Sequence, residues 1–228
     1  MPIRSLLTKY RLALVVLLSL LPWPAVWLGM YEGRSLAWTF VLYHGICLLP
    51  AAVTGRHLWR SAVKMPTLRQ ILNLAVTAAV VLPLTMIVYR WIGSTFISST
   101  DALGIVTTRG FHARWLVPLG FYFVTVNSIL EELFWRGVVL NELERVPEPY
   151  KRVGAVWTAL TFAAWHWLVV RLLVRPGWAE LTVAAIVVAG AFFSALYRRT
   201  GSIVLPILWH AIVFDLPLIL IFAAIVRG

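Results

Sequence analysis

The sequence predicts an all-α membrane protein, a polytopic helical bundle with about seven transmembrane helices. Of the 228 residues, 61% are hydrophobic and only 13% are charged, whereas soluble domains contain about 25% charged residues. The chain divides into apolar runs of about 20 residues, the length that an α-helix needs to cross the hydrocarbon core of a bilayer. Trp and Tyr residues stand near the ends of many of these runs, as is typical of the interface between membrane and water.

The apolar runs follow one another with short polar connections. The first is longer than the apolar core of a signal peptide, and we expect it to bend around Pro22 and Pro24, while Pro83 predicts a kink in the third. Residues 94–113 are too polar to span a membrane, so they predict a loop or an interfacial segment. The predicted spans are residues 12–31, 38–54, 71–92, 115–140, 153–173, 178–197 and 203–226.

Two regions are expected within this bundle. Residues 1–113 would contain the N-terminal transmembrane helices and an amphipathic connector. Residues 114–228 would form a four-helix core, which we expect to be catalytic because most of the unusual polar residues lie there. We see no internal repeat or low-complexity segment.

The distribution of basic residues predicts the orientation of the chain. The formal net charge is +11, which in a membrane protein indicates cytoplasmic loops that face anionic lipid, so we predict no nucleic-acid partner. More Lys and Arg residues fall on the N-terminal side of the bilayer than on the other side. We therefore expect a cytoplasmic N-terminus in a multi-pass protein, and the compact size favours a prokaryotic plasma membrane.

Residues 131–137 (EELFWRG) place three charged side chains inside the fourth predicted span. Each charge at the centre of a membrane helix costs roughly 2.5–3.5 kcal/mol, so such residues normally face one another or a wet cavity and serve a function. Glu132 and Arg136 are four residues apart, which predicts an ion pair on one helix face. Glu131 is turned about 100° from Glu132, so it remains available for other chemistry.

Two later spans bring further polar residues to the same depth. Counting about 1.5 Å per helical residue places Glu131, His166 and His210 in one layer. Phe162 lies one turn from His166 on the same face, and Asn127 lies one turn from Glu131, where it could form a hydrogen bond with it. A single histidine such as His44 in the second span is more often an ordinary packed residue.

This layer contains the groups that peptide hydrolysis needs. A carboxylate can take a proton from a water molecule while an imidazole orients that water, and a second histidine can donate to a developing oxyanion. Neither HExxH nor G-x-S-x-G occurs in the sequence. Asp101 and Asp215 lie in a polar segment and in the last span, which does not predict a paired-aspartate site.

The EELFWRG stretch resembles the E-E-x-x-x-R motif of the CPBP family, the CAAX-protease and bacteriocin-processing (Abi) membrane proteins. The family's F-x-x-x-H motif is matched by Phe162 and His166, and its later histidine by His210, so the resemblance covers roughly residues 115–226. It implies a glutamate-dependent intramembrane endopeptidase with Glu131 and His166 as the water-activating pair. It also implies supporting roles for Glu132 and Arg136 and an oxyanion-donor role for His210. Candidate substrate-binding residues are Phe162, Asn127 and Trp135.

The sequence departs from the family pattern after His210. The family has Asn or Asp four residues later, where this chain has Phe214, and Asp215 follows at the fifth position. A regular helix would turn Asp215 away from His210. Pro217 weakens the helix at this point, so we hypothesise a one-residue bulge that returns Asp215 to the face of His210.

Other functions remain open at this level. The chain could be a non-enzymatic immunity or binding protein of the same family, or a proton or ion pathway. We predict no cofactor, with zinc at Glu131, His166 and His210 as a minority alternative. The expected partners are the lipid bilayer and a membrane-anchored protein or peptide, such as a prenylated CAAX tail, a bacteriocin leader or a C-terminal sorting tail.

Overall fold

The computed structural model describes residues 3–146 and 150–227, and every regular element in these ranges is helical. Seven stretches are long and apolar enough to cross a membrane, as the sequence predicts, so the chain is an integral multi-pass protein. They are Tyr10–Glu32, Leu36–Thr54, Leu68–Phe96, Ala113–Glu144, Val153–Leu173, Trp178–Thr200 and Val204–Arg227.

The first span begins with a helix that is interrupted at a proline, and the second span and a short connection follow it. α1 (Ile3–Leu20) ends just before Pro22, where α2 (Pro22–Trp27) begins and leads into the π-helix η1 (Leu28–Glu32), so the predicted bend is confirmed. The second span contains α3 (Leu36–Phe40), the π-helix η2 (Val41–Leu48) and α4 (Leu49–Thr54). A short connection, α5 (Arg56–Trp59) and η3 (Arg60–Ala62), leads to the third span, α6 (Leu68–Phe96).

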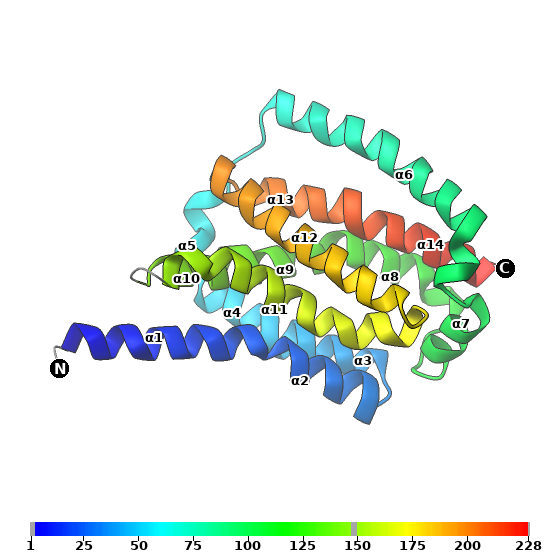
Figure 1. Cartoon of the computed structure of the whole chain (residues 1–228), viewed down its shortest axis with the longest axis horizontal. Helices are drawn as coiled ribbons and strands as arrows, with labels where there is room; N and C mark the ends of the chain where they lie inside the picture. Colours follow the sequence, from blue (N-terminus) through cyan, green and yellow to red (C-terminus); the bar gives the residue numbers. More distant parts are fainter. Residues whose placement is uncertain (1–2, 147–149, 228) are drawn as a thin grey trace.

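The helix α6 begins at a capping box and continues through its proline. The Thr67 side chain accepts from the backbone of Gln70, and the Gln70 side chain accepts from the backbone of Thr67, which satisfies two backbone donors at the helix start. α6 remains one helix across Pro83. Of the seven spans it is the least buried, and Figure 1 shows it along the outer edge of the bundle, beside α14.

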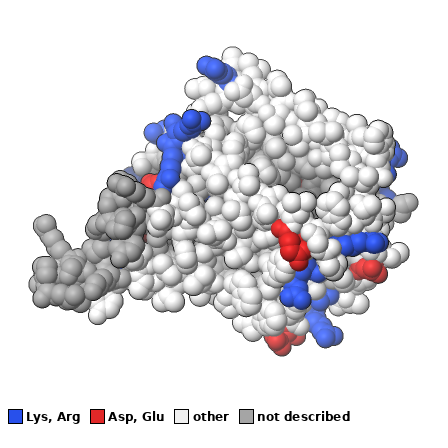
Figure 2. All heavy atoms as spheres, in the orientation of Figure 1, with Lys and Arg blue, Asp and Glu red and all other residues white. Residues whose placement is uncertain are grey.

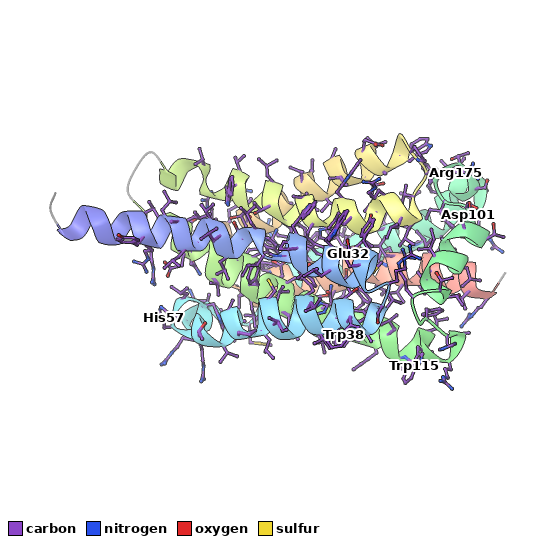
Figure 3. All side chains as sticks on the ribbon, turned by 90° about the horizontal axis from the view of Figure 1, so that it is seen from below. Glu32, Trp38, His57, Asp101, Trp115 and Arg175 are labelled. Carbon is purple, nitrogen blue, oxygen red and sulfur yellow. The ribbon has the colours of Figure 1, made fainter. Side chains whose placement is uncertain are left out.

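The segment predicted as a loop or interfacial segment contains a helix. α7 (Ser99–Thr107) starts at Ser98, whose hydroxyl accepts from the backbone of Asp101. It packs against the last helix and the fifth span, at the end of the bundle where Figure 3 labels Asp101, Trp115 and Arg175. The helix is short and amphipathic, so the low hydropathy that rules out a span does not rule out a helix.

The fourth span is built from six consecutive helical pieces and is longer than predicted. Its last piece, α10, is held to two other spans by ion pairs of Glu142 with Arg11 and of Glu144 with Arg198. The predicted polar connector that follows lies partly outside the described residues, since Pro147 and Pro149 fall there. The pieces are η4 (Ala113–Trp115), α8 (Leu116–Tyr122), η5 (Phe123–Asn127), α9 (Ser128–Glu132), η6 (Leu133–Leu140) and α10 (Asn141–Glu144).

The last three spans complete the bundle. α11 (Tyr150–Leu173) packs along α12 (Trp178–Thr200), which ends at Gly201 in the left-handed conformation with a φ of 59°. The seventh span consists of α13 (Val204–Trp209), the π-helix η7 (His210–Asp215) and α14 (Leu216–Arg227).

The arrangement of the chain ends agrees with an odd number of crossings. The N-terminus lies at one end of the bundle and the C-terminus at the other (Figure 1). His57 lies toward the N-terminal end (Figure 3), and Figure 2 shows charged side chains toward the two ends of this face with largely uncharged surface between them. Which end faces the cytoplasm stays a prediction.

The largest buried cluster joins the first, second, fourth and fifth spans. Its centre contains Leu48, Phe134, Trp135, Val139 and Phe162, each at most 2% exposed. Several of these apolar side chains belong to the same helical stretch as the polar residues of the fourth span, so the polar site is embedded in close apolar packing.

The first two spans approach each other at Gly29, which generates a prediction about stability. A Cβ atom at this position would lie 2.5 Å from the Cα of Thr39. We expect Gly29→Ala to lower the free energy of unfolding by about 1–3 kcal/mol through overpacking, measured by thermal unfolding of the detergent-purified protein. Gly45→Ala is the matched control, since a Cβ there meets nothing within 4 Å. Equal stabilities of the two variants would contradict the close packing.

Candidate active site

Glu131 and Glu132 end the short helix α9 in the middle of the fourth span, and both are at most 1% exposed. The Tyr43 hydroxyl, from the second span, donates to Glu131 Oε1 over 3.1 Å. Glu131 Oε2 and Glu132 Oε2 both lack a hydrogen-bond partner among the described residues, but Glu132 is neutralised by Arg136, whereas Glu131 Oε2 has only His210 Nε2 nearby, at 3.8 Å. An unpaired buried carboxylate oxygen is rare in folded proteins, so it marks a place where a further group is expected.

Glu132 forms the predicted ion pair with Arg136, with 2.8 Å between Arg136 Nη1 and Glu132 Oε1. The guanidinium also donates to the carbonyl oxygen of Gly190 over 2.9 Å and lies over the rings of Phe162 and Phe193 at 4.8 and 5.0 Å. Both charged side chains are completely buried. Because a lone charge would be far more expensive here, each group depends on the other to remain inside the bundle.

His210 joins the seventh span to both glutamates. Its Nδ1 lies 2.9 Å from Glu132 Oε1 and therefore donates to it, since a carboxylate oxygen only accepts. Its Nε2 lies 3.8 Å from Glu131 Oε2 and 3.5 Å from Asp215 Oδ1. The ring stacks on Phe193 at a centroid distance of 5.1 Å, so it is held by packing as well as by hydrogen bonding.

The hypothesised bulge after His210 is present. Residues 210–215 form the π-helix η7, which ends two residues before Pro217, and the wider turn brings Asp215 to the face of His210. Asp215 Oδ2 accepts from the Ser128 hydroxyl over 2.7 Å and from the Asn127 side-chain amide over 3.2 Å. The seventh span is thus bonded to the fourth through Asp215 as well as through His210.

His166 enters the site from the fifth span with a defined ring orientation. Its Nδ1 lies 2.7 Å from the carbonyl oxygen of Phe162 and must donate, so in the neutral ring the lone pair is on Nε2. The Trp165 ring packs on the imidazole at a centroid distance of 3.7 Å. Among the described residues, His166 makes no direct ion pair with the three buried carboxylates, which pair with His210 instead.

The three candidate substrate-binding residues are buried. Phe162 and Trp135 are 2% and 0% exposed and pack against each other at a ring-centroid distance of 5.8 Å. The predicted Asn127–Glu131 hydrogen bond is wrong: the amide oxygen of Asn127 lies 2.8 Å from His44 Nε2, and its nitrogen donates to Asp215. The wide turn η5 ends at Asn127, and a change of helical pitch shifts which side chains one turn apart can meet.

Sequence reasoning missed Tyr43 and Ser128 and treated His44 as an ordinary packed histidine. All three are buried and bonded to polar residues of the site. The available signal was the Tyr43–His44 pair in the middle of the second span, where neighbouring polar groups need partners because lipid offers none.

An apolar cavity of about 390 Å³ lies between the second and fourth spans. Its wall includes Phe40 and Tyr122, whose rings both contact His44 at a centroid distance of 5.4 Å, so these two rings lie between the cavity and His44. Its full lining is Leu36, Ala37, Phe40, Gly110, Phe111, Trp115, Pro118, Leu119 and Tyr122.

Zinc bound by Glu131, His166 and His210 is the minority alternative that the sequence leaves open. Across residues 3–146 and 150–227, no group of three or more His, Cys, Asp or Glu side chains is arranged to hold a metal ion.

Comparison with known proteins identifies the region that contains most of these residues. Residues 113–214 match the family model for Rce1-like proteins, described as type II CAAX prenyl endopeptidase Rce1-like. These residues, slightly less than half of the chain, are similar to that family, and we refer to residues 113–214 below as the Rce1-like domain. No curated protein and no solved structure matches the chain. The Rce1-like domain includes Glu131, His166 and His210, and its family is one of CAAX-type intramembrane proteases with protein substrates. Its buried Glu and His cluster is consistent with a catalytic site.

The Glu132–Arg136 pair generates a prediction about stability. We expect Arg136→Gln to lower the free energy of unfolding by about 3–5 kcal/mol, because the change leaves Glu132 as a buried charge with a weaker partner. Thermal unfolding in detergent measures the effect. Arg198→Gln is the control, since its partner Glu144 is 27% exposed and an exposed pair contributes at most about 1 kcal/mol. Similar losses in the two variants would contradict the role of the buried pair.

Proposed function

We propose that this protein is an intramembrane endopeptidase that hydrolyses a peptide bond of a membrane-anchored substrate with water activated by Glu131 and His166. The observation that carries the proposal is the Oε2 atom of buried Glu131, which has no hydrogen-bond partner among the described residues and lies 3.8 Å from His210 Nε2. Buried polar groups normally have partners, and a reacting water would supply this one.

Two hydrogen-bond acceptors would hold that water in position. Glu131 Oε2 is free, and the ring of His166 turns its unprotonated Nε2 away from the Phe162 carbonyl. A water molecule has two O–H bonds, so it can donate one to each acceptor and direct a lone pair toward a peptide carbonyl. The fixed Nδ1 donation of His166 maintains this orientation of the ring.

Hydrolysis then proceeds in two proton transfers. The water oxygen bonds to the carbonyl carbon while its proton passes to Glu131, and the carbonyl becomes an oxyanion. As the tetrahedral intermediate collapses, Glu131 returns the proton to the leaving nitrogen and the C–N bond breaks. The products are one carboxylic acid and one amine, which ionise to carboxylate and ammonium by passing one proton between them, so atoms and charges balance without a covalent enzyme intermediate.

His210 is suited to stabilise the oxyanion. Its Nδ1 is engaged with Glu132, whereas its Nε2 is 3.5 Å from Asp215 and so not fully committed. With a proton on each nitrogen, Nε2 would donate to the developing negative charge. Glu132 and Asp215 orient the ring, and Arg136 holds Glu132 in place through their 2.8 Å contact.

A membrane-anchored substrate suits the surroundings of the site. The proposed catalytic residues lie within spanning helices, and an apolar cavity lined by residues such as Phe40 and Trp115 lies between the second and fourth spans. A peptide attached to an apolar anchor reaches this depth without exposing charged residues to lipid. A prenylated CAAX tail is the first substrate to test, followed by a bacteriocin leader and a C-terminal sorting tail.

Replacement of the proposed base tests the mechanism. We expect Glu131→Gln to lower kcat for a membrane-anchored peptide by about 10²–10⁴-fold, because the amide cannot accept the proton of water. The assay uses proteoliposomes with labelled prenylated and other lipid-anchored peptides. Glu180→Gln, an exposed glutamate in α12, is the matched control and should cleave as the wild type does. Full cleavage by the Glu131→Gln protein would refute the proposed base.

Two substitutions of His166 distinguish the roles of its two ring nitrogens. His166→Asn places an amide near the position of Nδ1 and removes Nε2, whereas His166→Gln places a polar atom near Nε2. Since we assign the water to Nε2, we expect the Asn variant to lose about 10²-fold or more in kcat and the Gln variant to retain more activity. The reverse order, measured in the same proteoliposome assay, would contradict the assignment.

A further inference from the structure

A tyrosine from outside the Rce1-like domain contacts the proposed base. Tyr43 lies in the π-helix η2 of the second span and is 2% exposed. Its hydroxyl donates to Glu131 Oε1 over 3.1 Å. The family match begins at residue 113, so the match does not include Tyr43.

The ring of Tyr43 is fixed from two sides. It packs against Trp165 at a ring-centroid distance of 4.4 Å and against His44 at 4.7 Å. Trp165 in turn packs on His166. Tyr43 therefore contacts Glu131 directly and is linked to His166 through the Trp165 ring, so it is connected to both groups that we propose to activate water.

The contact determines how the Glu131 carboxylate is rotated. Rotation about the last side-chain bond of glutamate is broad and weakly restricted by itself. Among the described residues the Tyr43 hydroxyl is the one hydrogen-bond donor to Glu131, and it takes Oε1. This leaves Oε2 directed toward His210, 3.8 Å from its Nε2.

We propose that Tyr43 is a positioning residue for the hydrolytic reaction, which holds the Glu131 carboxylate so that Oε2 faces the reacting water. This inference rests on the proposed function. Tyr43 does not itself contact substrate, because its hydroxyl is occupied by Glu131 and its ring is covered by Trp165 and His44. The second span would thus complete the catalytic site of the Rce1-like domain.

Tyr43→Phe tests this role, because it keeps the ring and removes only the hydroxyl. We expect kcat for the membrane-anchored peptide to fall by about 10-fold or more, the effect of losing one hydrogen bond to a charged acceptor. KM should stay within about twofold, since Tyr43 does not touch substrate.

Tyr31→Phe is the matched control. The Tyr31 hydroxyl also donates across two spans, to the carbonyl oxygen of Leu168 over 2.7 Å, but it does not touch the site. We expect this variant to retain the wild-type kcat and KM. Both variants should have similar melting temperatures in detergent.

Three results would overturn the role of Tyr43. The first is an equal kcat for the Tyr43→Phe and Tyr31→Phe proteins, and the second is a change in KM with no change in kcat. The third is a melting temperature of the Tyr43→Phe protein far below that of the Tyr31→Phe protein, which would show that the hydroxyl stabilises the fold. Failure of the proposed function is a separate result, in which the Glu131→Gln protein cleaves as the wild type does.

Discussion

The site depends on the burial of the Arg136 guanidinium within an apolar bundle. An isolated charge at this depth would be expensive, so the guanidinium must be satisfied from several directions at once. Glu132 supplies the countercharge, the Gly190 carbonyl accepts a second N–H, and two phenylalanine rings cover its faces. These partners come from the fourth, fifth and sixth spans, and the requirement to satisfy one cation therefore fixes how three helices approach one another.

Small residues make this approach possible. A Cβ at Gly190 would lie 3.1 Å from the Cα of Ala159, so the sixth span comes close to the fifth where its carbonyl reaches Arg136. Close contact between helix backbones through small residues is a common way for membrane helices to associate, since lipid provides little hydrophobic drive between them. The same arrangement holds Glu132 still, and through Glu132 it orients His210.

Much of this organisation can be predicted from the sequence because the membrane restricts the alternatives. Hydropathy and length locate the seven spans, and the four-residue spacing of Glu132 and Arg136 predicts their pair. The extra residue before Asp215, together with Pro217, predicts the wide turn that the structure contains. The roles of Glu131, His166 and His210 in catalysis stay predictions.

Other features could not be predicted because they depend on packing between distant spans. The Tyr43–His44 pair indicates a need for polar partners, but Tyr43 carries no charge, so its local sequence does not identify a partner 88 positions away. Asn127 stands at helical spacing from Glu131, but the wide turn beside it and the presence of His44 direct it to other partners. The helix α7 is too short and polar to be distinguished from a loop by hydropathy alone.

The wide turn at His210 has a consequence for how such chains are found. A motif written as a fixed count of residues assumes one helical pitch, whereas chemistry depends on which side chains share a face. Here the Asp215 carboxylate lies 3.5 Å from the His210 imidazole, although one more residue separates the two than in the family pattern. The family match ends at position 214, immediately before Asp215. A pattern that permitted an insertion at this point would recognise the geometry in chains that a rigid spacing rejects.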